Sequence, residues 1–538
     1  MRGTEWYIPS FFRFEKQDAP KEAVGLSLDY WGRGPIVVTT VYVGPAILSL
    51  AAQAAGCDSA SNCTNSIYGM RPATILSNST AVSGLLAGLF CPLVGAVIDH
   101  TSYRRAVGQY TAYALVALAV CQIFVNEYLW VFLVVCQTLS QTIYGFHQLI
   151  TYAYNADLSQ DAAKQVVYNE KYQIIHTISR LVYIVAVGVT SGLFGMSSEV
   201  TASYSQIITT IQVGSCFAVC WPYLFSEVPP STPLPAGTSL MTAGFKKIQK
   251  TSQLIRKELP HVQWLMLAVF FNEAALVAVL SLLITVCVAL LKMNSTEISI
   301  LSTTLTATSY FGAKIGARIA ERINPLRGNI LGAFLYAVVT LVGCFMITGP
   351  TRKLYAYILA GLWGIGLTWV LANDLTLFIT LTPPHSRAEF MGIYVFSSSM
   401  GSWIPPAFFS YLVQMGVPIN LALASVTVFF VLGCLCYAAV GDFEHNVMKA
   451  NAFGSVMAAD GNTEHCGATD DAMLQKVVDG SLDETLDKSV ETGAETTRKD
   501  ETESALLSMS SSVSVASSST SASAKYGSIN IVNDQDNE

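Results

Sequence analysis

Apolar stretches recur along most of this chain and are separated by short polar segments. Each runs for about 20 residues, the length that a helix needs to cross the hydrocarbon core of a bilayer. Twelve such stretches begin near Pro35, Asn78, Arg104, Glu127, Tyr172, Tyr204, Val262, Glu297, Arg327, Leu354, Glu389 and Val417. A bilayer leaves backbone amides no partners outside their own segment, and the alternating pattern of a β-barrel is absent. We therefore expect twelve membrane-spanning helices.

The twelve spans fall into two sets of six, separated by a proline-rich polar segment that ends in the basic stretch FKKIQKTSQLIRKE. This plan resembles that of the major facilitator superfamily. The resemblance implies an all-α polytopic membrane protein built from two pseudo-symmetric six-helix bundles. The expected parts are a cytosolic N-terminal segment (1–34), two bundles (35–225 and 262–440), a cytosolic central loop (226–261) and a tail (441–538).

Composition agrees with a membrane protein and sets the tail apart. Only 12% of the residues are charged and 52% are hydrophobic, whereas soluble domains carry about 25% charged residues. From Gly441 onward the net charge is −12, while the preceding part carries +5. We expect this Ser-rich acidic tail to be disordered. Nucleic-acid binding needs clustered basic residues on one face, so the expected partners are the lipid bilayer and a small solute.

Basic residues are distributed unequally between the two sides of the membrane. With the N-terminus in the cytosol, the cytosolic segments hold 19 Lys and Arg residues and the opposite loops hold four. This bias predicts that both termini are cytosolic. The glycosylation sequons at Asn62, Asn78 and Asn294 all fall on the other side.

Two further features bear on the cellular compartment in which the protein is located. Cys57 and Cys63 lie in a polar loop, and they can form a disulfide if that loop faces an oxidising compartment. The tail contains Tyr526-Gly-Ser-Ile529, which matches a tyrosine-based sorting pattern. We favour a vacuolar or other endomembrane location. A plasma-membrane location stays open, because the distribution of basic residues does not distinguish an organelle lumen from the cell exterior.

Charged motifs recur in the two halves after the second and eighth spans. The loop GAVIDHTSYRR resembles the facilitator signature, and GARIAERINPLR occupies the matching position in the second half. Such a repeat is typical of an internally duplicated transporter. We expect a conformational latch of the outward-facing state, in which Gly95 lets two helices approach and Asp99 pairs with Arg104 and Arg105. The latch residues are Gly95, Asp99, Arg104, Arg105, Glu321, Arg322 and Arg327.

The segment from residue 382 to 406, TPPHSRAEFMGIYVFSSSMGSWIPP, resembles a narrower group. It is similar to the vacuole effluxers, the autophagy-related amino-acid effluxers of the superfamily. The matching positions are Glu389, Gly392, Tyr394 and Trp403. This resemblance implies efflux of amino acids from a vacuole-like compartment.

Polar residues inside spans are costly and therefore indicate function. Six are candidates for the solute or proton-coupling site: Glu273, Asp374, Arg180, His147, Asn155 and Asn272. A buried carboxyl group can take up and release a proton, so Glu273 and Asp374 are the proton-coupling candidates. Arg180 can hold a substrate carboxylate, and His147 can add hydrogen bonds. Structural alternatives are a snorkelling Arg180 and a His147 that is satisfied within the bundle.

Other functions stay open at this point. The chain can be a proton-coupled porter of a sugar or organic anion, or a transporter-like receptor or scaffold that binds without translocation. A nucleophile elbow, a metal motif and a phosphate-binding loop are all absent from the sequence. We therefore expect no enzymatic activity, no cofactor and no metal, and a monomeric transport unit.

Overall fold

The computed structural model describes residues 9–14, 19–58, 60, 63–159, 162–230, 234, 239–383 and 387–461. Within these ranges the chain forms helices and loops, with one isolated bridge between Ile67 and Met70 and no strand. The all-α fold class predicted from the sequence is confirmed.

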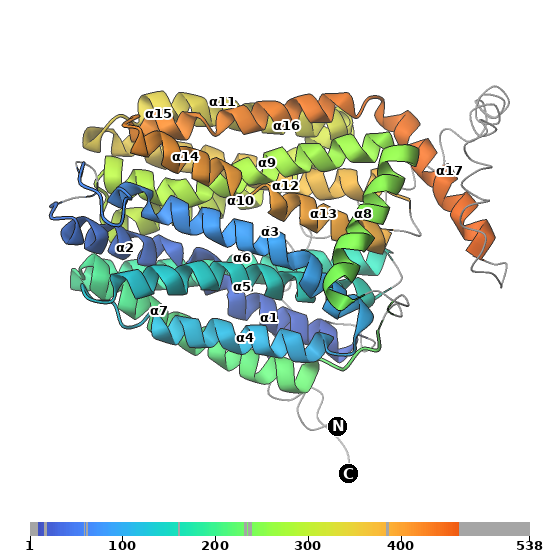
Figure 1. Ribbon diagram of the computed structural model, residues 1–538, viewed down its shortest axis with the longest axis horizontal. Helices are drawn as coiled ribbons and strands as arrows, with labels where there is room; N and C mark the ends of the chain where they lie inside the picture. Colours follow the sequence, from blue (N-terminus) through green and yellow to red (C-terminus); the bar gives the residue numbers. More distant parts are fainter. Residues whose placement is uncertain are drawn as a thin grey trace, which may run out of the picture. The chain divides into compact units, whose positions relative to one another are not determined.

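The first half of the chain supplies seven α-helices that run roughly parallel or antiparallel to one another (Figure 1). They are α1 (Lys21–Val38), α2 (Thr40–Ala54), α3 (Ile75–His100), α4 (Arg104–Cys121), α5 (Trp130–Asp157), α6 (Ala162–Phe194) and α7 (Ser198–Val219). Helices α1 and α2 are separated only at Thr39 and together form one long rod. A π-helical turn, η4 (Cys220–Leu224), extends α7.

The second half repeats this plan. Its helices are α9 (Pro260–Thr285), α10 (Ser295–Ile323), α11 (Pro325–Met346), α12 (Lys353–Leu381), α13 (Arg387–Met400), α14 (Ile404–Gln414), α15 (Ile419–Ala424) and α16 (Thr427–Ala439). A π-helical turn, η5 (Val286–Leu290), extends α9. Helix α8 (Leu240–Glu258) lies between the halves in sequence, and α17 (Phe443–Gly461) follows them.

Eight helical segments of the described chain are long and apolar enough to cross a membrane. They include the rod formed by α1 and α2, together with α3, α6, α9, α11 and α12. Helices α4, α5 and α10 and the pair α13–α14 fall short of that length or apolar character. They nevertheless pack beside the others where the sequence predicts spans, which is consistent with twelve crossings.

Two helix boundaries differ from the predicted ones. The helix that contains the start of the first predicted span begins at Lys21, ahead of Pro35, and α1 packs on α6 and α7. Arg33, which we count among the cytosolic basic residues, is therefore buried inside α1. Helix α17 occupies the first part of the tail that we expect to be disordered. Residues 462–538 lie outside the described ranges.

The two halves meet through equivalent helices. Helix α6 of the first half packs on α10 of the second half. Helix α3 of the first half packs on α13 and α14 of the second half. By order of spans, these are contacts of the fifth with the eighth and of the second with the eleventh. Exchanging the halves converts one contact into the other, as expected for a duplicated transporter fold.

The ends of the bundle differ in how the halves are joined. We name them the disulfide end, which carries Cys57 and Cys63, and the α8 end. Near the disulfide end, one continuous apolar cluster contains side chains of both halves, among them Tyr42, Ile184, Leu282, Ile298 and Phe409. Toward the α8 end the halves have separate clusters, one around Tyr172 and Trp221 and another around Leu265 and Leu377.

Polar contacts reinforce the closure at the disulfide end. The Ser299 hydroxyl of α10 lies 3.0 Å from the Tyr42 hydroxyl of α2, which itself donates to the carbonyl of Ile184 at 2.7 Å. Gly188 is so close to α10 that a Cβ atom there would lie 2.5 Å from the Ser299 Cβ. In this conformation, the halves are therefore packed shut at the disulfide end.

Candidate functional site

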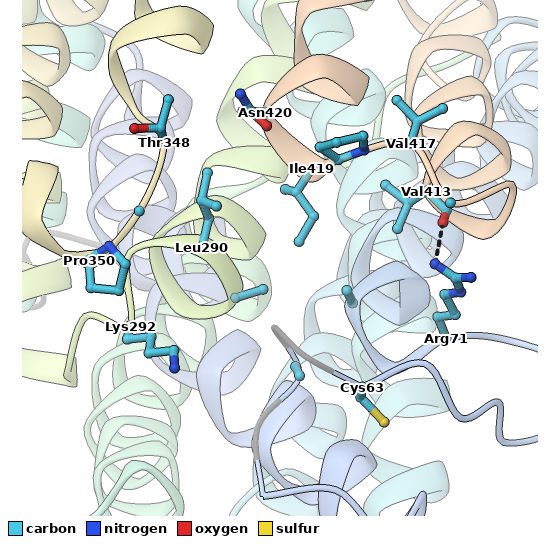
Figure 2. Close-up of a pocket in the computed structure, with 16 residues that line it drawn as sticks. Cys63, Arg71, Leu290, Lys292, Thr348, Pro350, Val413, Val417, Ile419 and Asn420 are labelled. Atoms are coloured by element: carbon cyan, nitrogen blue, oxygen red, sulfur yellow. Dashed lines mark hydrogen bonds between the residues drawn. The ribbon is translucent and has the colours of Figure 1, made fainter.

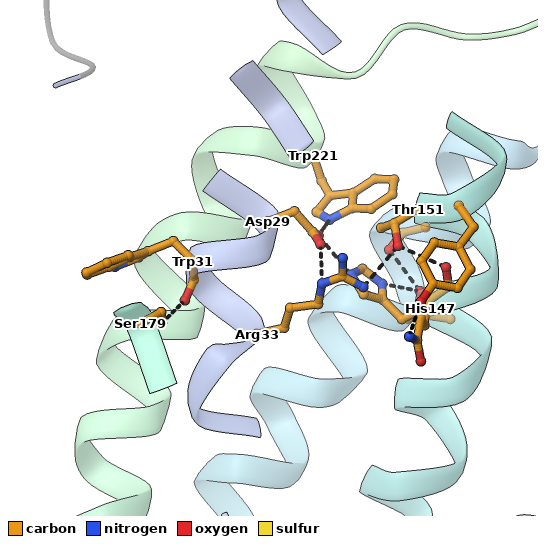
Figure 3. A network of polar contacts seen from close by, with 11 residues as sticks. Asp29, Trp31, Arg33, His147, Thr151, Ser179 and Trp221 are labelled. Carbon is orange, nitrogen blue, oxygen red and sulfur yellow. Dashed lines mark hydrogen bonds and ion pairs between the residues drawn. The ribbon is translucent and has the colours of Figure 1, made fainter. Parts of the chain in front are cut away.

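A buried polar network lies inside the first half, where α1, α5 and η4 converge (Figure 3). Asp29 and Arg33 are one turn apart on α1, and Arg33 Nε lies 3.0 Å from Asp29 Oδ1. His147 Nε2 of α5 lies 2.8 Å from Asp29 Oδ2, and Trp221 Nε1 donates to the same oxygen at 3.1 Å. Arg33 also donates to the Thr151 hydroxyl at 3.0 Å.

This network is balanced in charge. The side chains of Asp29 and His147 are 0% exposed and that of Arg33 is 1% exposed. The guanidinium also lies 3.8 Å from the centre of the Tyr30 ring. The other ring nitrogen of His147 lies 3.0 Å from the Thr111 hydroxyl, so both nitrogens have partners. Since each charge has an opposite charge beside it, the network can stay ionised without water.

The sequence prediction finds one member of this network and misses the others. His147 is predicted, and the structure buries it among partners. Asp29 and Arg33 are missed, because we place them in a cytosolic segment before the first span. A signal is present: the two residues are four positions apart within the otherwise uncharged stretch VGLSLDYWGRGPIVV, so they share one helix face.

A second polar network lies inside the other half and centres on Asp374 of α12. This side chain is 0% exposed. Its Oδ1 accepts a hydrogen bond from Asn329 Nδ2 of α11 at 2.7 Å and another from the Tyr437 hydroxyl of α16. Asn272 Nδ2 of α9 lies 3.4 Å from the Tyr437 hydroxyl. The predicted residues Asp374 and Asn272 are thus brought together.

Glu273 follows Asn272 on α9 and is only partly buried. Its Oε1 accepts a hydrogen bond from the Tyr394 hydroxyl of α13 at 2.9 Å. Within the described residues, neither Glu273 nor Asp374 forms an ion pair, and Asp374 Oδ2 has no hydrogen-bond partner. A buried carboxyl group without a cation favours its protonated form. This half therefore holds two acids whose described partners are hydroxyl and amide groups.

The other predicted candidates lie outside both networks. Arg180 of α6 is partly buried and donates to the Thr177 hydroxyl at 3.2 Å. Its Nε is buried and has no hydrogen-bond partner among the described residues. Asn155 is near the end of α5 and donates to Asn169 Oδ1 at 2.5 Å, close to the α8 end. Asn155 is thus joined to its neighbour α6.

Although helices of the two halves are packed together at the disulfide end, a cavity of about 480 Å³ lies between their loops there (Figure 2). Its charged lining residues in the described chain are Arg71 and Lys292, both basic. The Arg71 guanidinium donates to the carbonyl of Val413 at 3.0 Å and so joins the halves. Cys63 also lines the cavity and is bonded to Cys57 in a disulfide, the arrangement that the sequence leaves open.

Residues 18–450 match the family described as vacuole effluxer Atg22 like. The chain belongs to this family. A curated relative from Bacillus subtilis (strain 168), an uncharacterized MFS-type transporter called YxiO, is 21% identical over 433 residues, which cover 80% of this chain and 95% of that protein. The resemblance to vacuole effluxers predicted from the sequence is confirmed.

Solved transporters share the fold of this vacuole effluxer family member. A D-xylose-proton symporter superposes with a TM-score of 0.57 and 14% identity, covering 80% of this chain and 99% of that one. The nucleoside transporter NupG gives a TM-score of 0.55 and 10% identity, covering 78% and 100%. The major facilitator fold is therefore confirmed.

The vacuole effluxer motif lies on α13 and at the start of α14. Tyr394 of this motif donates to Glu273, which links the motif to a predicted coupling residue. The Trp403 backbone lies against Gly84 of α3, where a Cβ atom would be 3.1 Å from the Trp403 nitrogen. Gly392 faces open space. The side chain of Glu389 lies outside the described part of the structure.

In this conformation the first latch motif forms other charged pairs than the predicted ones. Asp99 pairs with Lys247 of α8 at 2.8 Å, and not with Arg104 or Arg105. Arg104 instead forms an ion pair with Asp157 of α5, and Arg105 donates to the carbonyl of Pro222 at 2.6 Å.

The remaining latch positions lack the predicted contacts in this conformation, which is closed at the disulfide end. A Cβ atom at Gly95 would meet nothing within 4 Å. Glu321, Arg322 and Arg327 form no ion pair within the described ranges, and all three are exposed. Asp99, near the end of α3, and Arg104, at the start of α4, pair with residues of α8 and α5, because α8 packs on α3 and α5 packs on α4.

The sequons have different surroundings. Asn78 lies within α3, is partly buried, and its amide contacts the Met70 sulfur at 3.1 Å. Asn294 is exposed and caps α10, with its side-chain oxygen accepting from the Glu297 backbone at 2.9 Å. Asn62 lies outside the described residues. Among the described sequons, Asn294 is the more accessible to modification.

Proposed function

We propose that this vacuole effluxer family member is a secondary active transporter that moves a small polar solute by alternating access. Its proposed activity is proton-coupled efflux of amino acids from a vacuole-like compartment. One observation carries the proposal: Glu273 and Asp374 lie inside a membrane-spanning half without a cation among the described residues. Carboxyl groups in this setting can exchange protons as the site changes its exposure.

An amino-acid substrate needs partners for both of its charges. Arg180 in the first half has an unfilled donor that suits a carboxylate. Glu273 in the second half is partly exposed, and its carboxyl group suits an ammonium group. These two residues belong to opposite halves, so a zwitterion bound to both would sense their relative movement.

Proton-coupled efflux from an acidic compartment requires the solute and the proton to move in the same direction. In this proposal the substrate ammonium pairs with the Glu273 carboxylate while a proton neutralises Asp374, because burial disfavours a charge that is left unpaired. The loaded carrier therefore changes its exposure with both carboxyl groups neutralised, and it releases solute and proton on the cytosolic side. A D-xylose-proton symporter of the same fold is named for coupling in the same direction.

The test is solute flux in proteoliposomes that contain the purified full-length protein. Labelled amino acids, sugars and organic anions are compared with and without an imposed proton gradient. We expect gradient-dependent amino-acid flux that falls to background in Glu273→Gln. Glu127→Gln is the matched control, because Glu127 is an exposed carboxylate in the loop between α4 and α5. The control is expected to transport like the wild type.

Each outcome has a distinct meaning. Flux of a sugar or an organic anion alone would retain the transporter and remove the amino-acid assignment. Gradient-driven flux that persists in Glu273→Gln would move coupling away from this residue. A folded, correctly inserted protein without any flux would favour the receptor or scaffold alternative.

Location and orientation are separate parts of the proposal. The family match and the basic loops support an endomembrane location with both termini in the cytosol. A fluorescent tag at the C-terminus should co-localise with an acidic compartment and should be digested by protease added to intact vesicles. Protection of the tag would contradict the proposed orientation.

A further inference from the structure

Helix α8 lies across the bundle near the end opposite the disulfide, nearly perpendicular to the membrane-spanning helices (Figure 1). Since the spanning helices run along the membrane normal, α8 runs roughly parallel to the membrane surface. It packs against α3 of the first half and against α9 and α13 of the second half. It therefore touches both halves at the end where they have separate cores.

The inward face of α8 is closely fitted. Gly244 is so near α3 that a Cβ atom would lie 1.9 Å from the carbonyl oxygen of Pro92. Pro92 lies inside α3 and not at its end, so α8 rests against the side of that helix. Lys247 pairs with Asp99 at 2.8 Å, and Ile255 packs into a cluster with Phe390 of α13.

The outward face of α8 has two different edges. Met241 and Phe245 are one turn apart, and they are 69% and 45% exposed. Lys246, Lys250 and Lys257 are exposed and share the other edge, since helical positions four and eleven apart align. The helix carries five basic residues and one acid. An exposed apolar edge beside a basic edge is typical of a helix at a membrane interface.

We propose that α8 is an anionic-lipid binding helix, whose basic edge holds phospholipid phosphates while Met241 and Phe245 enter the acyl region. Its position against the side of α3 places the outward face where headgroups surround the bundle. Juxtamembrane lysines attract anionic lipids with a free energy that adds up over neighbouring charges. Lipid bound here would also hold in place the helix that bridges the two halves.

The experiment uses the full-length protein in nanodiscs of phosphatidylcholine, with and without phosphatidylglycerol. Amide hydrogen exchange of residues 240–258 is the readout, so transport is not required. We expect anionic lipid to slow exchange in this segment at least about tenfold. The variant Lys246→Gln/Lys250→Gln/Lys257→Gln should lose that slowing while keeping the wild-type unfolding temperature.

Arg318→Gln/Arg322→Gln/Arg327→Gln is the matched control, because these three exposed cations lie near the same end but not on α8. The control should retain the slowing. Equal loss in both variants would show a general surface-charge effect and overturn the proposal. Slowing by inorganic phosphate in neutral nanodiscs would overturn the lipid assignment, as would identical exchange in both lipid compositions.

Discussion

The two buried polar networks differ in how their carboxyl groups are neutralised. In the first half, Asp29 has Arg33 at 3.0 Å and His147 at 2.8 Å, so a negative charge is met by a positive one. In the second half, Asp374 and Glu273 have tyrosine and asparagine partners and no described cation. The first network thus pairs its carboxylate with a cation, whereas the second gives its carboxyl groups only neutral partners among the described residues.

This difference assigns the networks different roles. A carboxylate fixed beside a guanidinium stays ionised, and removing one member leaves the other uncompensated. A carboxyl group surrounded by hydroxyl and amide groups is neutral when protonated, so it can hold a proton while buried and release it where water or a substrate ammonium reaches it. We therefore expect the first network to stabilise the fold and the second to couple protons.

The largest expected effect is on the first network. Arg33→Leu leaves the Asp29 carboxylate buried without its cation, and the free energy of unfolding should fall by about 3–5 kcal/mol. Thermal unfolding of the purified protein in detergent checks this. Arg318→Leu, which removes an exposed cation of α10, should change it by no more than about 0.5 kcal/mol. Equal stability of Arg33→Leu and wild type would contradict a stabilising role.

Asp374→Asn should separate stability from transport. The amide has nearly the shape of the protonated acid, so unfolding should change by less than about 1 kcal/mol. Gradient-driven flux should fall to background, because the residue can no longer bind and release a proton. Uptake into proteoliposomes measures the effect. Severe unfolding of this variant, like that of Arg33→Leu, would show that Asp374 is ionised and paired, and would remove the contrast.

His147→Gln should have an intermediate effect. Glutamine keeps a donor for Asp29 but loses the second contact with Thr111, so stability should fall by about 1–3 kcal/mol. Protein that remains folded should still show gradient-driven flux. Lost coupling with intact stability would instead place proton transfer at Asp29 and His147.

Tyr394→Phe should give the smallest change. It removes the hydroxyl that donates to Glu273 while keeping the ring packed against Phe378. A hydrogen bond of this kind is worth about 0.5–1.5 kcal/mol, so flux should fall about two- to tenfold. Tyr411→Phe is the control, because Tyr411 is 56% exposed on α14. Equal fluxes for the two variants would mean that this hydroxyl does not tune Glu273.

Much of the fold is predictable because a bilayer imposes strong rules on sequence. Apolar length gives the spans, and the family motif on α13 identifies the architecture. The first helix begins earlier than the sequence suggests, because Asp29 and Arg33 are typical of a charged cytosolic segment. Their charges cancel each other in the folded helix, and a count of single residues does not register that cancellation.

The site is only partly predictable for a related reason. Glu273, Asp374 and His147 stand out as costly residues inside spans, and the structure gives each a buried or partly buried network. The partner of Asp99 does not stand out, because Lys247 is distant in sequence and reaches it only through the packing of α8 on α3. Long-range pairing depends on tertiary contacts that a linear motif does not contain.

The shared apolar cluster at the disulfide end has a thermal consequence. Opening that end to water would hydrate side chains such as Leu282 and Phe409, and hydration of apolar surface raises heat capacity. A van't Hoff plot of the equilibrium constant between the two access states should then be curved rather than straight. Cooling weakens apolar association, so the closed disulfide end should lose part of its advantage in the cold.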